Sequence, residues 1–440
     1  MTTAEMFNTF LDNIKIPDED ADQISLRYHE ITKSLNKKFR QTESETANCL
    51  QVGSYGRWTG IKSISDLDML YIMPKSSWDK YKNDQYQILS DTKDAIKSHY
   101  SQTDVKVDRL VVVVQFTNFK VEVQPVFEEY DDNGECYFKY PETYYGGSWK
   151  ITKPRQEIAA MTEFVQTKNN NLRKLCKMTR AWKNKCGEAM GGLLVDTLAY
   201  NFLNGTNAYD SSGYGSNDKM VEDFFCYLKD QQKQDYYLAL GGHQRVKVKH
   251  DFRKVAKNAF EQCQKANAET DPVKRSKKWR SIFGRFFPAE EYVCESARAY
   301  TFNDTEEFIE NKYPVDIRNY LRIDCIVTSD GFLTRKLRQM LQSQMRLPVR
   351  RSLKFYIEQT DVEAPFTVLW KVRNRGSRAE HLDKIRGQII PSSSGKDIHS
   401  IRKESTSFYG PHYVGCYIVK NGVVVARDLI DVPINEGTEE

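Results

Sequence analysis

The chain has 440 residues, with 65 Lys and Arg against 60 Asp and Glu, and a net charge of +5. At roughly 150 residues per domain, this length predicts about three domains. Apolar residues make up 40% of the sequence and aromatic residues 12%, which excludes a globally disordered chain. No window approaches about 18 consecutive apolar residues, so no membrane span is expected.

The N-terminal residues and the cysteines bear on the cellular compartment. The first twelve residues lack the basic and apolar regions of a secretory signal. The nine cysteines form no CxxC pair, and a chain of this length needs no disulfides to fold. We therefore expect a cytoplasmic protein with reduced thiols.

The first part of the chain alternates between helical and extended patterns. Apolar residues from Ile24 to Phe39 recur at helical spacing, which predicts a long helix near the N-terminus. Residues 66–73 form an apolar run that predicts a buried strand. A second helix is expected over residues 84–100, followed by two β-branched strands over residues 105–116 and 120–127.

The remainder turns helical and then β-rich. Residues 157–203 have a helical pattern interrupted at Gly191-Gly192, and another helix is expected over residues 251–268. After Pro288 the pattern alternates as in strands, and Asn421-Gly422 is typical of a hairpin turn. The strands expected there cover residues 353–357, 366–372, 412–419 and 423–429.

Three carboxylates in the first third of the chain suggest a metal site. Asp66 and Asp68 are two residues apart at the start of a predicted strand, so they point to the same face. Adjacent carboxylates repel each other unless a cation lies between them, and oxygen ligands suit Mg²⁺. Glu122 is a polar residue within another apolar strand. Three such groups on neighbouring strands can hold two Mg²⁺ ions, which activate a hydroxyl nucleophile and stabilise a leaving pyrophosphate.

A glycine-serine pair precedes this set. Gly53-Ser54 offers backbone N–H groups and a hydroxyl to a triphosphate, without a side chain at Gly53 to block its approach. Asp-x-Asp alone is also typical of a turn or a helix cap, and Gly-Ser alone is less specific still. The ordered set of Gly-Ser, paired aspartates and a later acidic strand is much more specific.

Several segments together resemble one family. Residues 53–74 (GSYGRWTGIKSISDLDMLYIMP) resemble the nucleotidyltransferase core of polymerase-β-like enzymes. They are most similar to bacterial CD-NTases of the SMODS type, relatives of cyclic GMP-AMP synthase and oligoadenylate synthase. Residues 171–183 (NLRKLCKMTRAWK) and 279–288 (WRSIFGRFFP) resemble the helix behind the nucleotide and the end of the catalytic core. Further segments resemble the AGS-C sensor domain: residues 370–376 (WKVRNRG), 386–389 (RGQI) and 412–428 (HYVGCYIVKNGVVVARD).

The resemblance implies an α+β fold: a polymerase-β-like nucleotidyltransferase core with a helical lobe, as in oligoadenylate synthase, and a β-rich C-terminal domain. The expected boundaries are 1–165 for the palm with the long N-terminal helix, 166–300 for the helical lobe and 301–440 for the sensor domain.

The resemblance also implies site residues. Asp66 and Asp68 would bind two Mg²⁺ ions, with Mn²⁺ as an alternative metal. Glu122 would bind the ion facing the acceptor, although the family usually has Asp there. Lys177 and Arg180, spaced i, i+3 on one predicted helix face, match the family's phosphate-binding residues. With Gly53 and Ser54, these two would hold the donor phosphates.

The implied activity is synthesis of cyclic di- or trinucleotides from nucleoside triphosphates such as ATP or GTP. The product would activate an effector protein in antiphage defence of the CBASS type. One alternative is the same chemistry with a linear product, or with RNA or protein as acceptor. Another is a catalytically silent nucleotide or RNA sensor.

Two basic features leave further binding open. Residues 243–286 contain 13 Lys and Arg against 4 Asp and Glu, which fits a solvated helical face or a contact with a polyanion such as nucleic acid equally well. In the C-terminal domain, a group of basic residues has two interpretations: a pocket for a sensed anionic ligand, or ordinary surface arginines. The second interpretation is favoured. The residues concerned are Arg373, Arg375, Arg386, Arg402 and His412.

Overall fold

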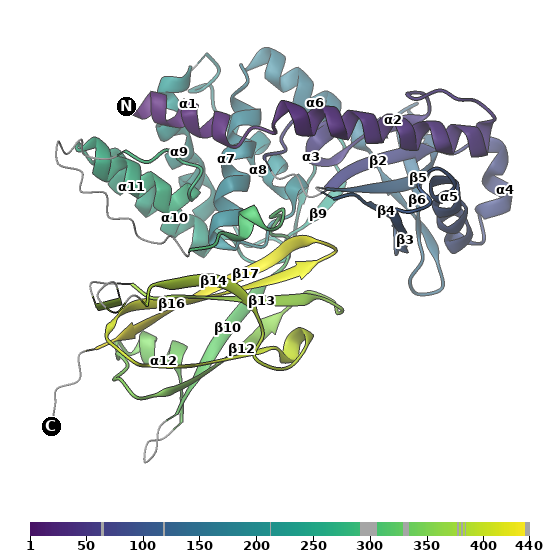
Figure 1. The fold of residues 1–440 in the computed structure, drawn as a ribbon. Helices are drawn as coiled ribbons and strands as arrows, with labels where there is room; N and C mark the ends of the chain where they lie inside the picture. Colours follow the sequence, from purple (N-terminus) through teal and green to yellow (C-terminus); the bar gives the residue numbers. More distant parts are fainter. Residues whose placement is uncertain are drawn as a thin grey trace. The chain divides into compact units, whose positions relative to one another are not determined.

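The chain divides into two compact units in a computed structural model (Figure 1). The N-terminal unit comprises residues 1–182 and 191–291, and the C-terminal unit comprises residues 183–190 and 292–440. The structure describes residues 1–62, 66–117, 119–211, 213–290, 306–328, 334–375, 378–379, 382 and 384–435. Residues 63–65 and Gly376, which belong to segments named above, lie outside the described residues.

The N-terminal unit combines a mixed sheet with many helices. Its strands are β1 (Cys49–Gln51), β2 (Asp66–Ile72), β3 (Asp104–Asp108), β4 (Val111–Gln115), β5 (Lys120–Tyr130), β6 (Cys136–Glu142), β7 (Ser148–Thr152), β8 (Tyr236–Leu238) and β9 (Arg245–Lys247). Its helices are α1 (Thr3–Asn13), α2 (Asp18–Arg40), α3 (Gly53–Gly56), α4 (Trp78–Tyr81), α5 (Gln85–His99), α6 (Pro154–Thr167), α7 (Asn171–Cys186, whose last turn belongs to the other unit), α8 (Gly192–Asn204), α9 (Asn217–Lys229), α10 (Arg253–Asn267) and α11 (Pro272–Phe283).

The main sheet has the strand order β1-β2-β5-β4-β3, with β6 paired to β5 and β7 paired to β6. The strands β2 and β5 are parallel, and every other pair in this sheet is antiparallel. A parallel pair brings equivalent ends of two strands to the same edge of a sheet. The N-terminal halves of β2 and β5 therefore lie side by side.

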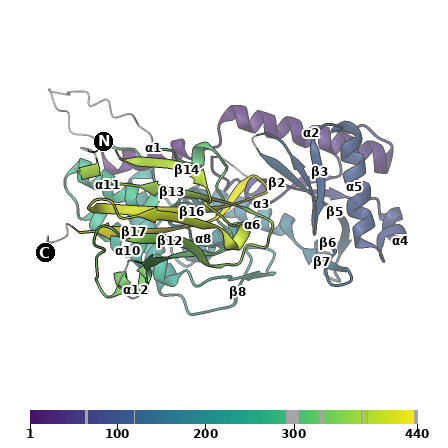
Figure 2. The ribbon, with the colours of Figure 1, turned by 60° about the horizontal axis from the view of Figure 1, so that its bottom comes forward.

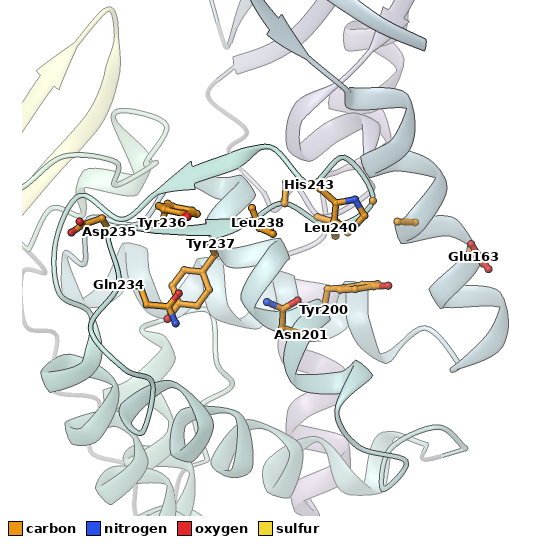
Figure 3. A pocket seen from close by; sticks show the side chains of 13 residues that line it. Glu163, Tyr200, Asn201, Gln234, Asp235, Tyr236, Tyr237, Leu238, Leu240 and His243 are labelled. Carbon is orange, nitrogen blue, oxygen red and sulfur yellow. The ribbon is translucent and has the colours of Figure 1, made fainter. Parts of the chain in front are cut away.

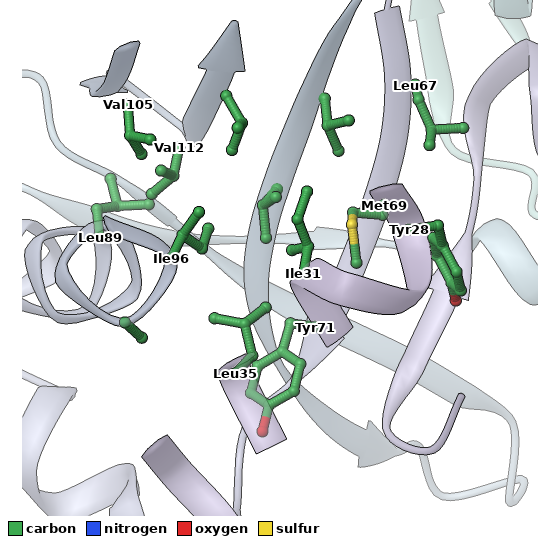
Figure 4. Packing of buried hydrophobic residues seen from close by; sticks show 14 of the residues in the cluster. Tyr28, Ile31, Leu35, Leu67, Met69, Tyr71, Leu89, Ile96, Val105 and Val112 are labelled. Carbon is green, nitrogen blue, oxygen red and sulfur yellow. The ribbon is translucent and has the colours of Figure 1, made fainter. Parts of the chain in front are cut away.

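Helices α2 and α5 cover one face of this sheet, and the side chains packed between the helices and the sheet are apolar. Ile31 and Leu35 of α2 meet Met69 and Tyr71 of β2 there (Figure 4). Helix α5 packs against β3 at the end of the sheet (Figure 2). These residues are fully or almost fully buried, and such burial is the main favourable term in folding. The face opposite the helices keeps the carboxylates of β2 and β5.

Most of the predicted elements of this unit are present. The predicted helices over 24–39 and 84–100 correspond to α2 and α5, and the predicted strand over 66–73 corresponds to β2. The single strand predicted over 105–116 is wrong, because the chain turns back at Arg109 and forms the hairpin of β3 and β4. Arg109 adopts a left-handed conformation with φ 50°. The sequence does not predict this turn, because it contains no Gly, Asn or Pro.

Helix α1 was not predicted from the sequence. An aromatic cluster holds this helix against α11. Phe7 and Phe10 pack against Phe283 of α11 and against Phe287, with ring centroids 4.7–6.0 Å apart. Trp279 completes the cluster and lies 4.8 Å from the ring of Phe7. The two ends of the N-terminal unit's sequence therefore meet in one aromatic core.

The C-terminal unit is a sandwich of two four-stranded sheets. Their strand orders are β11-β10-β12-β15 and β14-β13-β16-β17. The elements are β10 (Leu321–Thr328), β11 (Arg335–Lys336), α12 (Leu337–Gln342), β12 (Ser352–Thr360), β13 (Thr367–Arg373), β14 (Arg386–Pro391), β15 (Ile401–Ser405), β16 (Gly410–Lys420) and β17 (Val423–Ile434). Buried residues from both sheets, among them Phe355 and Trp370, form one core. The predicted hairpin joins β16 to β17, and Asn421 and Gly422 both have positive φ, as a type I′ turn requires.

Residues 183–190, although they precede the other unit's α8 in sequence, belong to the C-terminal unit. Lys183 is almost fully buried and its Nζ bonds the Asp316 carboxylate and the Ile317 carbonyl, each at 2.7 Å. The Asn184 side chain donates to the Val315 carbonyl at 2.8 Å and accepts from the Ile317 N–H at 3.1 Å. The end of α7 is thus held by residues 315–317.

The mixture of helices and strands with a β-rich C-terminal unit confirms the predicted α+β fold class. Among the described residues, no helix is both long and apolar enough to cross a membrane.

Candidate active site

The predicted carboxylates come together at the edge where β2 and β5 begin. The parallel register pairs Asp66 with Lys120 and Asp68 with Glu122. Asp66 and Asp68 point to one face of β2 because they are two residues apart. One oxygen from each of Asp66, Asp68 and Glu122 lies within 4.8 Å of the others. Asp66 is buried, and the other two are half-buried and reachable from solvent.

The chemistry of this triad fits a divalent cation. Three carboxylates this close would repel one another strongly, and a hard cation with oxygen ligands relieves that repulsion. The triad offers oxygen donors alone, which favours Mg²⁺ or Mn²⁺ over softer metals. Lys120 also contributes charge to the site, since its Nζ donates to Glu122 Oε1.

Gly53 lies directly against Asp68 of the triad, and Ser54 follows it in α3. The Val52 N–H donates to the Asp68 carbonyl at 2.9 Å, which fixes the start of α3 beside β2. Gly53 has φ +65°, and a Cβ at this position would lie 1.9 Å from Asp68 Oδ2. Only glycine fits, because any side chain would displace a candidate metal ligand. The structure therefore places the predicted phosphate-binding turn next to the predicted metal ligands.

Lys177 and Arg180 lie on α7 in different environments. Lys177 is half-buried, and no hydrogen bond or ion pair of its side chain is found within the described residues. Burial, with smaller contributions from Arg173, Arg180 and Lys15, lowers the pKa of Lys177. Arg180 pairs with Asp196 and Lys15 with Asp18, whereas Lys177 keeps its positive charge available for an anion.

Arg180 is buried and holds Asp196 of α8 with its guanidinium, at 2.5 Å from Nη1 and 2.9 Å from Nη2. Its Nη2 also donates to the Gly192 carbonyl at 3.1 Å. The phosphate contact expected of Arg180 stays a prediction. The observed contacts of its side chain hold α7 against α8.

Sequence reasoning missed the centre of this buried network. Asp196 also accepts from Arg57 Nε at 2.8 Å and from Thr59 Oγ1 at 3.0 Å. Arg57 caps the C-terminus of α3, and its Nη1 donates to Glu157 of α6 at 2.7 Å. The network therefore ties the turn after Gly53-Ser54 to α6, α7 and α8. A lone aspartate in the apolar segment GLLVDTLAY was the only available signal.

The electrostatics of the network are those of a desolvated ion cluster. Burial alone would raise the pKa of Asp196, but the charges of Arg180 and Arg57 outweigh it and hold that pKa well below its usual range. Burial raises the pKa of Glu157, and the charge of Arg57 opposes this only in part. Asp196 is therefore the carboxylate that keeps both arginines paired near neutral pH.

A separate hollow of about 850 Å³ lies between α6, α8 and the β8 strand (Figure 3). Tyr200 and Asn201 of α8 face Tyr236 and Leu238 of β8 across it, and Glu163 of α6 lies at its edge. Its lining includes none of the predicted site residues.

In the C-terminal unit, the arginines for which an anion pocket was the less favoured interpretation are largely paired. Arg386 and Arg402 both bond Glu404, at 2.7 Å and 2.6 Å, and Arg373 lies 3.2 Å from Glu306. His412 accepts from the Arg375 N–H at 3.2 Å. A cavity of about 150 Å³, lined by Arg386, Glu404 and His412 together with apolar side chains of both sheets, lies beside them. The ion pairs leave it less basic than its arginine count indicates.

Comparisons with known proteins agree with this geometry. Residues 1–164 match the family model of the Second Messenger Oligonucleotide or Dinucleotide Synthetase domain, SMODS. Residues 303–435 match the family model of the Adenylyl/Guanylyl and SMODS C-terminal sensor domain, AGS_C. No curated protein matches the chain.

Two solved structures share the fold at low sequence identity. One is the CdnC:HORMA-deltaN complex from E. coli MS115-1, at 12% identity and a TM-score of 0.52. The other is CdnC with ATP from the same source, at 13% identity and a TM-score of 0.51. Each alignment covers 66% of this chain and 99% of the other.

The matched SMODS domain, with which the fold and the acidic site agree, defines a nucleotidyltransferase with a polymerase-β-like core. The two matched domains identify the chain further: it combines a SMODS domain, a synthetase of second-messenger oligonucleotides or dinucleotides, with an AGS_C sensor domain.

Proposed function

We propose that this enzyme makes cyclic di- or trinucleotide second messengers from nucleoside triphosphates by a mechanism that depends on two divalent ions, Mg²⁺ or Mn²⁺. The observation that carries the proposal is the convergence of Asp66, Asp68 and Glu122, with their ligand oxygens within 4.8 Å, against a glycine that admits no side chain. A structural ion pair would require one carboxylate, whereas a metal pair requires several.

The residues divide into three tasks. Asp66 and Asp68 would hold both ions, and Glu122 would hold the ion on the acceptor side and orient the acceptor hydroxyl. When bound, such ions lower the pKa of the hydroxyl and stabilise the pyrophosphate leaving group. Gly53 and Ser54 would hold the donor phosphates through backbone N–H groups and a hydroxyl, and Lys177 would add positive charge, assisted by Arg180.

The catalytic test is product analysis in a reaction with all four triphosphates and either Mg²⁺ or Mn²⁺. We expect products that resist phosphatase, which removes exposed terminal phosphates from linear products but leaves cyclic ones intact, and mass spectrometry then gives ring size. The variant Asp66→Ala with Asp68→Ala should abolish turnover. The matched control Asp18→Ala with Asp20→Ala removes two aspartates of the same spacing near the exposed start of α2 and should leave turnover unchanged.

Each outcome is informative. Products degraded by phosphatase would replace the cyclic product by a linear one, and label found only on RNA or protein would identify a macromolecular acceptor. Full turnover by the double aspartate variant would refute the assignment of the site.

The cellular role is part of the same proposal. Its support is the pairing of a second-messenger synthetase domain with a sensor domain in one chain. We assign residues 1–165 to the palm, 166–300 to the helical lobe and 301–440 to a sensor domain whose ligand controls synthesis, with residues 183–190 of the lobe's sequence packed in the C-terminal unit. The enzyme would act in the cytoplasm, where triphosphates are abundant, and its product would activate an effector protein in CBASS-type antiphage defence. Phage plating on cells with the full system and on cells with the double aspartate variant tests this role.

A further inference from the structure

Lys120 lies within the acidic site as a buried cation. It is the first residue of β5, directly beside Asp66 in the parallel register and two residues before Glu122, so its side chain shares the face of the triad. It is 7% exposed, and its Nζ donates to Glu122 Oε1. A buried ammonium group loses its hydration, so a position of this kind requires charged partners.

The presence of this lysine is unexpected in a site built only to attract metal. Three carboxylates and one ammonium group have a smaller net negative charge than the carboxylates alone, and this weakens the attraction for a free divalent ion. The ammonium group also bonds Oε1 of Glu122, one of the two oxygens that this carboxylate could offer to a metal ion.

The same charge has the opposite effect on a metal–nucleotide complex. A triphosphate carries more negative charge than one divalent ion neutralises, so the complex arrives as an anion. Three unscreened carboxylates repel that anion, and a lysine among them reduces the repulsion.

We propose that Lys120 is a positioning residue that holds the Glu122 carboxylate in the metal-free enzyme and adapts the site to the metal–nucleotide complex rather than to the free ion. The inference rests on the proposed function of the triad. Glu at position 122 is consistent with it: the longer side chain lets the carboxylate contact Lys120 while an oxygen remains within 4.8 Å of ligand atoms of Asp66 and Asp68.

Two binding measurements on the full chain separate the effects. The Kd of free Mn²⁺ follows from the electron paramagnetic resonance signal of the unbound ion. The Kd of a non-hydrolysable ATP analogue with Mg²⁺ follows from calorimetry. In Lys120→Met we expect Mn²⁺ to bind about tenfold more tightly and the Mg²⁺–analogue complex about tenfold more weakly.

Lys120→Arg preserves the positive charge and should keep both constants within about threefold of the wild-type values. Lys120→Gln is a second neutral variant that retains a hydrogen-bond donor for Glu122, and it should reproduce the opposed shifts if Lys120→Met fails to fold. Lys97→Met, which removes an exposed lysine of α5, should change neither constant.

The opposed directions make the result decisive. A lysine with a purely structural role would weaken both affinities together when replaced, and equal shifts or no shift in a folded neutral variant would overturn the proposal. Failure of the underlying metal site has a different signature: wild-type protein would then bind Mn²⁺ no better than the variant Asp66→Ala with Asp68→Ala.

Discussion

Replacing Asp196 by asparagine tests whether the buried network holds the phosphate-binding turn in place. The side chain is fully buried and accepts hydrogen bonds from Arg57, Thr59 and Arg180 at 2.5–3.0 Å. Asparagine has nearly the same shape, but it removes the negative charge and turns one acceptor oxygen into an NH₂ donor. Two buried guanidinium groups would then face a neutral amide.

The expected loss of stability depends on which hydrogen-bond partners each arginine keeps. Removing one partner of a buried ion pair costs about 3–5 kcal/mol, because the remaining charge is left uncompensated. Arg57 retains Glu157 and Arg180 retains the Gly192 carbonyl, so the loss is partly offset. We therefore expect Asp196→Asn to lower the free energy of unfolding by about 3 kcal/mol, at the low end of that range.

Urea unfolding of the full chain, followed by tryptophan fluorescence, measures this change. The matched control is Asp79→Asn, because Asp79 also forms an ion pair, with Lys82 at 2.8 Å, but its side chain is 84% exposed. Exposed pairs contribute little, so the control should be indistinguishable from wild type. A loss below about 1 kcal/mol in Asp196→Asn would refute the reasoning, since it would mean that water or rearrangement compensates both arginines.

Three further predictions concern the same unit. Gly53→Ala should reduce turnover of labelled ATP by at least about 100-fold, because its Cβ would lie 1.9 Å from Asp68 Oδ2. The control Gly134→Ala, also at positive φ but with nothing within 4 Å of the added Cβ, should retain activity. An active Gly53→Ala variant would contradict the close approach. Lys177→Ala should raise KM for the triphosphate by about tenfold with a smaller change in kcat, whereas an unchanged KM would exclude a role in phosphate binding. The pKa of Asp196 is depressed on folding, so its stabilisation is present above its unfolded pKa of about 3.9 and is lost as pH falls below that value. Urea midpoints measured from pH 6 to pH 2.5 should therefore fall more steeply for wild type than for Asp196→Asn, and parallel curves would argue against the depressed pKa.

The paired aspartates of the acidic triad were accessible to sequence reasoning because their geometry is local. Asp66 and Asp68 share a face through the two-residue period of a strand, and Glu122 stands out as a polar residue in an apolar strand. The parallel pairing of β2 with β5 is seen only in the structure, although it agrees with the fold that the family resemblance implied. The side chains meet because the strands are in register.

The supporting contacts were not accessible, because they join residues far apart in the chain. Arg57 reaches Glu157 and Asp196 across 100 and 139 residues, and no periodicity relates these positions. The turn at Arg109 was missed for a different reason: strand-forming valines lie on both sides of it, and arginine is not a residue that sequence rules favour in the left-handed conformation.

The end of α7 has a practical consequence for dissecting the enzyme. Lys183 and Asn184 are bound by residues 315–317, although they precede α8 in the chain. A protein shortened to its first 290 residues would keep the Lys183 side chain and lose the carboxylate that neutralises it. The catalytic and sensory halves are thus interleaved along the gene, and neither can be excised, or exchanged with that of a relative, by a single cut.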